Sequence, residues 1–250
     1  MTTEPATREE LLISLLSDML AQDRHVAVGA ASPIPGAAAL LAKAEKQARQ
    51  GGRMQVTIIH SRRHNPFTEG SRELFDCAGR GDIDSFFLGG VQIDGQANIN
   101  LVGVGEYPSL KKRFPGSFGS ALMYYVVPKV ILFREEHSPR TLVEKVDFIS
   151  APGISAPEVH RPGGPHALVT GRAVFDWIKD SGRFRLKTVH AGETVDSIRE
   201  ATGFGFDVAD DVSETDAPNN ERLDLIRREI APKVHTFYPE FASRVWGLAA

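Results

Sequence analysis

His60 is the residue of this sequence best placed to do acid–base chemistry. It follows Met54–Ile59, an apolar run that is continuous rather than alternating, which is typical of a strand covered on both faces in a parallel sheet. Open α/β sheets place ligands and catalytic groups at the carboxyl ends of their strands, and an imidazole titrates near neutral pH. We therefore expect His60 at the carboxyl end of a central parallel strand. The alternative is a histidine that caps the strand by bonding a nearby carbonyl.

Two segments concentrate positive charge. Arg62 and Arg63 follow His60, and Lys111–Arg113 is a basic triplet further along the chain. We expect them to form a rim that binds an anionic ligand, because guanidinium and ammonium groups make charge-assisted hydrogen bonds to phosphate. The alternative interpretation is an ordinary solvated surface.

A glycine turn, Gly116–Ser120, precedes an apolar stretch, Ala121–Val127, that is expected to begin a helix. Backbone N–H groups in such a turn can point at an anion or a developing oxyanion, because glycine permits close approach and helix N-termini carry partial positive charge. A simple turn before a helix is the alternative.

Several kinds of chemistry have no support in the sequence. Cys77 has no nearby cysteine and is interpreted as a packing residue. The eight histidines show no metal-binding spacing, so no metal is expected. Gly103–Gly105 lacks the third glycine of a dinucleotide fingerprint, and there is no Walker A motif, so nucleotide-dependent redox or phosphoryl chemistry is not favoured.

The composition is that of an ordinary soluble globular protein. Its 29 Lys plus Arg against 32 Asp plus Glu give a formal net charge of −3, so nucleic acid is not an expected partner. No apolar run approaches the roughly 18 residues of a membrane-spanning helix, and Met1–Glu10 lacks the apolar segment of a signal peptide. One cysteine excludes an internal disulfide, and we expect a cytoplasmic protein with no membrane partner.

The first part of the chain alternates between expected helices and strands. Thr7–Gln22 is expected to be a helix that begins with a capping box of Thr7 and Glu10, and an alanine-rich helix is expected to close at Gly51–Gly52. Short apolar runs predict strands at His25–Val28, Met54–Ile59, Ser85–Leu88, Ile99–Val104 and Lys129–Phe133. The alternation predicts an α/β fold with an open, mostly parallel sheet and helices on both faces.

The pattern changes beyond Pro152. Turn residues separate Ala167–Thr170, Ala173–Trp177 and Phe184–Val189, which predicts antiparallel strands. Two helices are expected to follow, Thr194–Thr202 and Asn220–Ile230, the second ended by Pro232. The prediction is a single domain over residues 1–250, with a C-terminal hairpin and helix extension over about 151–250.

Two motifs resemble the β subunit of class I CoA-transferases, and the most similar type is that of glutaconate CoA-transferase. They are Leu88–Asn100, LGGVQIDGQANIN, and Lys111–Gly119, KKRFPGSFG. The resemblance runs in a consistent order over roughly residues 10 to 232. It includes Val146–Gly153, Ala201–Phe204 and Leu225–Ile230.

The resemblance implies a subunit that pairs with a homologous α subunit in a hetero-oligomer and transfers CoA between carboxylic acids. Coenzyme A is then a substrate, and no cofactor is bound permanently. The family's oxyanion and CoA-binding positions match Gln92, Asn98, Lys111, Arg113, Phe118, Gly119 and Ser120.

The chain departs from the family at the catalytic strand. In members of the family this strand ends in three apolar residues followed by Glu-Ser-Gly. The glutamate attacks the thioester to give a covalent glutamyl-CoA intermediate. The matching segment is Thr57–Arg62, so His60 and Ser61 occupy the places of the catalytic pair. The family's arrangement of nucleophile and oxyanion loop implies that His60 faces a cleft shared with the Phe118–Ser120 backbone. If His60 attacked the thioester itself, the resulting acyl-imidazole would hydrolyse readily. His60 is better suited to general-base activation of water, so a hydrolase of CoA esters or of CoA-linked rings is an alternative to transfer.

Three further features bear on the activity. Glu69 is an alternative nucleophile if its loop folds back, and a non-catalytic scaffold subunit is an alternative to any enzyme. Ala97 and Phe118 stand where the family usually has glycine, which predicts a reshaped acyl pocket and a narrower oxyanion loop.

Overall fold

The computed structural model describes residues 4–50 and 52–249, which divide into two compact units. The first unit holds the chain up to Thr68, the short segment Ile83–Ser85 and the chain from Asp216 onward. The second unit holds Glu69–Asp82 and Phe86–Thr215. The prediction of a single domain stays a prediction, and the two units are described separately.

The main sheet has eight strands in the order β12-β11-β10-β9-β8-β3-β1-β2, which confirms the predicted open α/β sheet. Pairs β1–β2, β8–β9 and β11–β12 are parallel, whereas β10 is antiparallel to both β9 and β11. The strands are β1 (His25–Val28), β2 (Gln55–Ile58), β3 (Ser85–Leu88), β8 (Lys129–Arg134), β9 (Pro165–Thr170), β10 (Ala173–Ile178), β11 (Arg183–Val189) and β12 (Asp207–Glu214).

Two strand predictions need correction. The strand before His60 is not central, because β2 is the last strand in the sheet order and, among the described residues, pairs with β1 alone. The run Ile99–Val104 is not one strand of the main sheet. It forms β5 (Ile99–Asn100), which pairs with β4 (Gln92–Ile93), and β6 (Gly103–Val104), which pairs with β7 (Lys112–Arg113). Asn100 separates them, since its Oδ1 accepts the N–H groups of Val102 and Gly103 and turns the chain.

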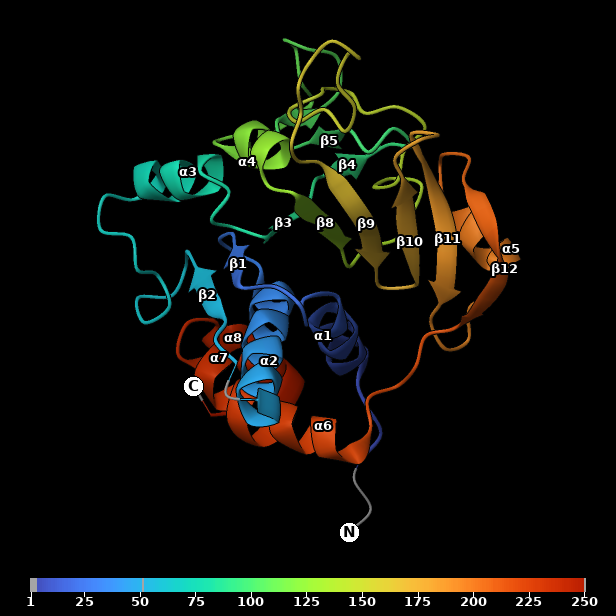
Figure 1. The fold of residues 1–250 in the computed structure, drawn as a ribbon. Helices are drawn as coiled ribbons and strands as arrows, with labels where there is room; N and C mark the ends of the chain where they lie inside the picture. The colour runs from blue at the N-terminus through green and yellow to red at the C-terminus, as the bar shows by residue number, and fades with distance from the viewer. Residues whose placement is uncertain (1–3, 51, 250) are drawn as a thin grey trace. The chain divides into compact units, whose positions relative to one another are not determined.

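The first unit is built around β1, β2 and helices from both ends of the chain (Figure 1). The predicted capping box of Thr7 and Glu10 starts α1 (Arg8–Met19). The alanine-rich helix is α2 (Pro33–Gln50), and the predicted closing residue Gly51 lies outside the described residues. The C-terminal helices are α6 (Asn220–Leu225), α7 (Ala231–His235) and α8 (Pro239–Trp246).

Pro232 does not end the helix that precedes it. The chain passes from α6 through a π-helical turn, Ile226–Ile230, into α7, and Pro232 lies in the first turn of that new helix. The Ala231 N–H donates to the Ile226 carbonyl, five residues back, so the hydrogen-bond register shifts just before the proline. A proline at the start of a helix loses no hydrogen bond, and the helix therefore continues.

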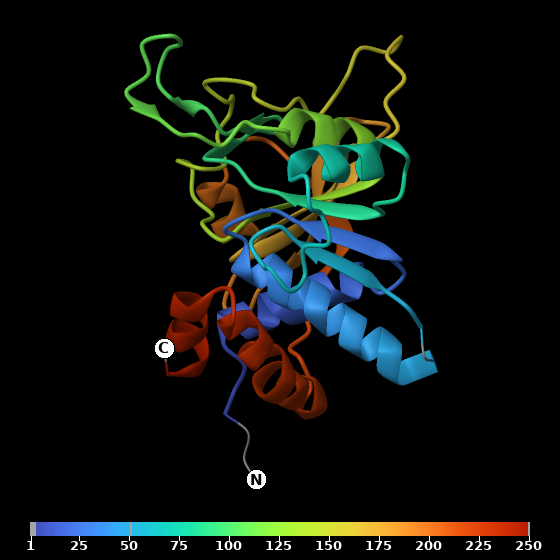
Figure 2. The same cartoon turned by 90° about the vertical axis from the view of Figure 1, so that its left-hand side faces the viewer.

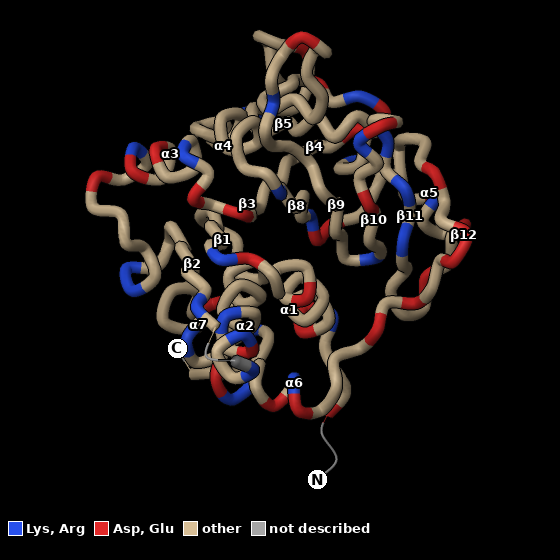
Figure 3. The backbone as a smooth tube through the Cα atoms, viewed as in Figure 1, with Lys and Arg blue, Asp and Glu red and all other residues tan. Residues whose placement is uncertain are grey.

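The second unit contains the antiparallel strands β9–β11, as predicted, together with an edge strand that the sequence did not indicate. Strand β12 is rich in acidic residues and pairs in parallel with β11, whose exposed face is basic (Figure 3). The pair Arg183–Asp207, at 3.6 Å, is one contact between these opposite charges. Strand β12 has few apolar residues, and its acidic side chains complement the basic side chains of β11.

Three short helices complete the second unit. Helices α3 (Ser71–Gly79) and α4 (Ser120–Val126) lie side by side, and α5 (Val195–Ala201) follows β11 (Figure 2). No helix among residues 4–50 and 52–249 is long and apolar enough to cross a membrane.

A buried histidine ties α5 to the sheet of the second unit. The His137 Nδ1 lies 2.8 Å from the Thr170 Oγ1 on β9, and its Nε2 lies 2.9 Å from the Thr202 Oγ1 at the end of α5. Burial, with a smaller contribution from the Arg172 charge, lowers the pKa of His137 to about 4. The imidazole is therefore neutral in the folded protein at neutral pH.

This neutral imidazole predicts acid sensitivity of the fold. In the unfolded chain His137 binds a proton near pH 6.5, whereas in the folded chain it does so only near pH 4. Its stabilising contribution is complete above about pH 6.5 and declines as the pH falls toward 4, by up to about 3 kcal/mol. Urea unfolding of the wild type and of His137→Gln between pH 7 and 4 should give the steeper decline for the wild type. Parallel curves for the two proteins would contradict the assignment.

Candidate functional site

His60 lies in a tight turn directly after β2, as the sequence predicted for the end of a parallel strand. The turn is closed by the Ser61 N–H donating to the Ile58 carbonyl at 2.9 Å and by the Ile58 N–H donating to the His64 carbonyl at 3.0 Å. Ser61 is buried and its Oγ accepts the His64 N–H at 3.2 Å. The serine therefore shapes the turn, while His60 is exposed.

The imidazole of His60 stacks on the phenol ring of Tyr238. Their centroids are 5.1 Å apart and the rings are within 4° of parallel. The Ser32 N–H, which follows β1, donates to the Tyr238 hydroxyl at 3.1 Å. Within the described parts of the chain, no hydrogen bond reaches either ring nitrogen of His60. Both nitrogens are thus available to a substrate or to water.

Cations surround the next histidine of the turn. His64 packs edge-on against Phe237, with centroids 5.9 Å apart. Burial first, and then the charges of Lys43, Arg63 and Lys233, lower the pKa of His64. This corner of the first unit is electropositive, and an anion there would be stabilised by the same charges.

The predicted oxyanion loop stands at the start of α4 in the second unit. Gly119 has a left-handed backbone with φ of 71°, and a side chain there would collide with the ring of Phe75, so only glycine fits. The side chain of Phe118 is 79% exposed and contacts the Phe75 ring. Ser120 is buried, and its hydroxyl donates to the Ser117 carbonyl. No acceptor in the described chain takes the N–H groups of Phe118 or Gly119.

Gln92 and Asn98 are buried, and their amides make hydrogen bonds to neighbouring loops of the chain. The Gln92 Oε1 accepts the Asn100 Nδ2–H at 2.7 Å and the Asp147 N–H at 3.0 Å. The Asn98 Oδ1 accepts the Gly153 N–H at 3.1 Å. These contacts hold the loops between the short strands, so a role of Gln92 or Asn98 in binding CoA stays a prediction.

The basic triplet lies in and next to β7 and is exposed. The Lys112 ammonium lies 5.0 Å from the centre of the Phe114 ring. Lys111 and Arg113 have no ion pair with any residue in the described ranges. Their charges are free to meet a ligand or a partner.

Two other candidate nucleophiles have local roles. Glu69 is exposed and pairs with Arg72 at 3.6 Å. Cys77 lies half-buried on α3, and burial, helped by the Asp82 charge, raises the pKa of its thiol. A raised pKa disfavours the thiolate and agrees with a packing role. Among the described residues no group of three His, Cys, Asp or Glu side chains is arranged to hold a metal ion.

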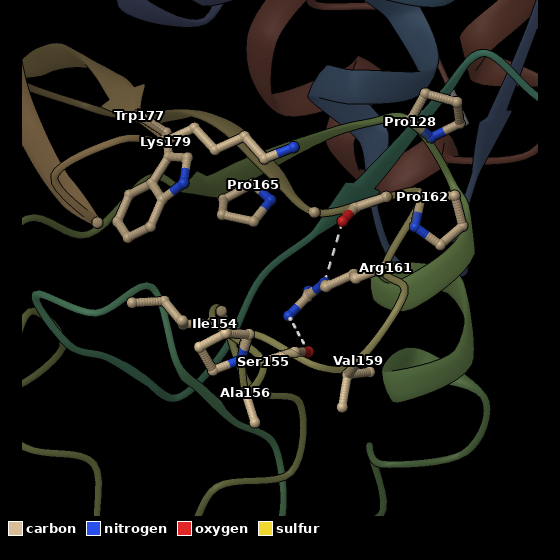
Figure 4. A pocket seen from close by; sticks show the side chains of 15 residues that line it. Pro128, Ile154, Ser155, Ala156, Val159, Arg161, Pro162, Pro165, Trp177 and Lys179 are labelled. Atoms are coloured by element: carbon tan, nitrogen blue, oxygen red, sulfur yellow. Dashed lines mark hydrogen bonds between the residues drawn. The ribbon is translucent and has the colours of Figure 1, made fainter.

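A cavity of about 350 Å³ in the second unit contains none of the predicted site residues (Figure 4). The proline-rich segment Gly153–Pro165 and Trp177 line most of it. Arg161 spans one side, where it donates to the Ser155 Oγ and to the Gly163 carbonyl. The lining of this cavity includes no carboxylate, histidine or cysteine.

His60, Ser61 and Arg62 belong to the first unit, and the other predicted site residues belong to the second. The cleft that His60 was expected to share with the Phe118–Ser120 backbone therefore stays a prediction. Sequence reasoning missed Tyr238, because nothing local to that residue indicates a contact with the turn after β2.

The profile of the Coenzyme A transferase family matches residues 14–201. The B subunit of the 3-oxoadipate CoA-transferase of Pseudomonas knackmussii is 33% identical over 59% of this chain and 58% of its own length. The IpdB subunit of the cholesterol ring-cleaving hydrolase of Rhodococcus jostii is 27% identical over 65% of each chain. Both alignments thus span less than two thirds of the relative.

The fold is also that of a solved relative. The crystal structure of glutaconate CoA-transferase from Acidaminococcus fermentans aligns with a TM-score of 0.78 over 93% of this chain and 97% of its own, at 22% identity. The relatives named here include two different reactions, CoA transfer and hydrolytic ring cleavage. Similarity alone therefore does not decide which reaction this chain supports.

Proposed function

Because this chain belongs to the coenzyme A transferase family, we propose that it is the B-type subunit of a hetero-oligomeric enzyme that cleaves a CoA thioester with water. The similarity to a protein named as the B-type component of such an enzyme supports the pairing with a homologous A-type subunit. The acyl-CoA is the substrate in this proposal.

The observation that supports hydrolysis is that His60 is exposed and that, in the described chain, its ring nitrogens are free to act on water. It stands where the resembled subunits have their nucleophilic glutamate, it is exposed, and no described residue engages its ring nitrogens. A neutral imidazole takes a proton from water, the hydroxide attacks the thioester carbonyl, and the C–S bond breaks. The proton then passes to the departing thiolate, which gives a carboxylic acid and free CoA.

The oxyanion of this reaction needs hydrogen-bond donors. The N–H groups of Phe118 and Gly119 have no acceptor in the described chain, and both residues lie in the motif Lys111–Gly119 that resembles the family. We therefore assign these N–H groups the role of oxyanion donors. The aromatic pair of Phe118 and Phe75 then lies next to the acyl group and favours an apolar acyl chain.

Transfer of CoA between carboxylic acids is the second candidate, favoured by the similarity to the 3-oxoadipate enzyme. Transfer through an enzyme-bound thioester needs a carboxylate, and the His60 imidazole cannot form a stable thioester of that kind. Transfer would therefore require another nucleophile.

The complex with its A-type subunit should be incubated in ¹⁸O-labelled water with a panel of short-chain and dicarboxylic acyl-CoA esters. Hydrolysis predicts free CoA in the absence of any acceptor acid, together with one ¹⁸O atom in each carboxylic acid formed. Formation of the CoA ester of an added carboxylic acid, with no free CoA and no label from water, would replace this proposal by transfer. A complex that binds acyl-CoA but converts none would favour a scaffold subunit.

CoA binding by this complex is expected to depend on Arg113. Charge-assisted contacts to phosphate contribute about 1.5–3 kcal/mol, so Arg113→Ala should weaken CoA binding roughly tenfold or more, and less so at high salt. Lys112→Ala is the matched control, since it removes one positive charge from the neighbouring position, whose side chain points to the other side of β7. Isothermal calorimetry measures both. Unchanged CoA affinity with weaker subunit association would move Arg113 from the ligand site to the interface.

A further inference from the structure

We propose that Tyr238 is a positioning residue that holds the imidazole of His60 in the orientation needed for catalysis. This inference rests on the proposed function, because it gives His60 the role of general base. It concerns the first unit alone, in which both residues lie.

The contact between the two rings has the geometry of an aromatic stack. The centroid distance of 5.1 Å and the interplanar angle of 4° describe parallel, offset rings. Such a stack fixes the plane of the imidazole without using either nitrogen. An exposed histidine would otherwise exchange between rotamers, and only a fraction of them would direct a nitrogen at the substrate.

Tyr238 is itself held firmly. Its hydroxyl accepts the Ser32 N–H at 3.1 Å, and its own N–H donates to the Val234 carbonyl at 2.8 Å. Its ring packs edge-on against Phe237, with centroids 5.0 Å apart. Burial raises the pKa of the Tyr238 hydroxyl, so the phenol stays neutral. The ring is a fixed platform that connects the loop after β1, the turn after β2 and the start of α8.

The stack requires an aromatic ring at the end of β2 as well as at Tyr238. A glutamate at the end of β2 would present no ring face to stack on Tyr238. The aromatic platform is therefore useful to this chain because its catalytic side chain is an imidazole.

Tyr238→Leu removes the ring, and Tyr238→Phe keeps the ring but not the hydroxyl. In the assembled complex, with the ester that it hydrolyses fastest, we expect Tyr238→Leu to lower kcat about tenfold while KM stays within about twofold. Tyr238→Phe should stay within about twofold of the wild type. In a His60→Gln background, Tyr238→Leu should have almost no further effect, since the group that it positions is gone.

A second readout reports on the stack directly. The ring protons of His60, observed by NMR in the full chain with ¹³C-labelled histidine, should be shifted upfield by the phenol ring and should move downfield in Tyr238→Leu. Tyr238→Met serves the same comparison if Tyr238→Leu fails to assemble.

The outcomes separate the two claims. Unchanged ring-proton positions in Tyr238→Leu, or rate losses of Tyr238→Leu and His60→Gln that add fully, would overturn the positioning role. A fully active Tyr238→Leu beside an inactive His60→Gln would overturn this inference alone. A fully active His60→Gln would overturn the proposed role of His60 as general base, and the positioning role would fall with it.

Discussion

Replacement of His60 by glutamine is expected to slow hydrolysis of the acyl-CoA substrate by about 10²–10⁴-fold, which is the usual contribution of a positioned general base. Glutamine keeps a polar side chain of similar reach but cannot take a proton from water. Because Ser61 and the backbone close the turn after β2 without help from the imidazole, the fold should survive the change. Steady-state release of free CoA from the assembled complex measures the effect.

His64→Gln is the matched control for this experiment. His64 lies in the same turn, but its ring packs against Phe237 rather than on Tyr238, and its lowered pKa arises from burial and nearby cations. We expect this variant to retain most of the activity. Equal losses in His60→Gln and His64→Gln would indicate damage to the turn as a whole. Full activity of His60→Gln would assign the base to another residue or to the partner subunit.

The sequence correctly predicted the helices and strands whose limits are set by residues within or next to them. The strands β1 and β3 are short, wholly buried apolar runs bounded by polar or glycine residues, and their predicted and observed limits coincide. The start of α1 was predicted from its capping box. Interactions within a few residues decide such elements.

The missed elements depend on distant partners. Strand β12 has a weak apolar pattern and pairs with β11, where basic side chains meet its acidic ones. The π-helical turn before Pro232 depends on a shift of hydrogen-bond register, and no residue type in the segment predicts that shift. The edge position of β2 follows from the strand order, which the apolar run Met54–Ile59 does not encode.

The candidate site divides in the same way. The position of His60 at a strand end follows from the segment Met54–Ile59, in which four of six residues are apolar, and the sequence predicted it. The stack on Tyr238 joins the turn after β2 to the beginning of α8. Only the packing of the C-terminal helices within the first unit creates this stack, so no local pattern of residues could predict it.

The ion pair between Glu10 and Arg227 should make a large contribution to the free energy of unfolding. Replacement of Arg227 by methionine is expected to lower the free energy of unfolding by about 3–5 kcal/mol, because it leaves a buried carboxylate without its partner. The Glu10 side chain is 1% exposed, and the Arg227 guanidinium contacts its two oxygens at 2.7 and 2.8 Å. Burial alone would raise the pKa of Glu10, but hydrogen bonds from Arg227, Thr7 and Trp246 outweigh it, and the pKa is lowered.

Urea unfolding of the full chain at pH 7 tests this prediction with Arg228→Met as the matched control. The side chain of Arg228 is 74% exposed and lies 3.7 Å from Asp224, so its loss should cost less than about 1 kcal/mol. Adding Glu10→Gln to Arg227→Met should restore part of the stability, because the unpaired buried charge is then removed. Equal losses for the two arginine variants, or a double variant less stable than Arg227→Met, would mean that the ion pair does not hold α1 to the C-terminal helices. A loss confined to Arg227→Met and relieved by Glu10→Gln would show that the first unit, which carries His60 and its platform, is stabilised by a contact between residues at opposite ends of the sequence.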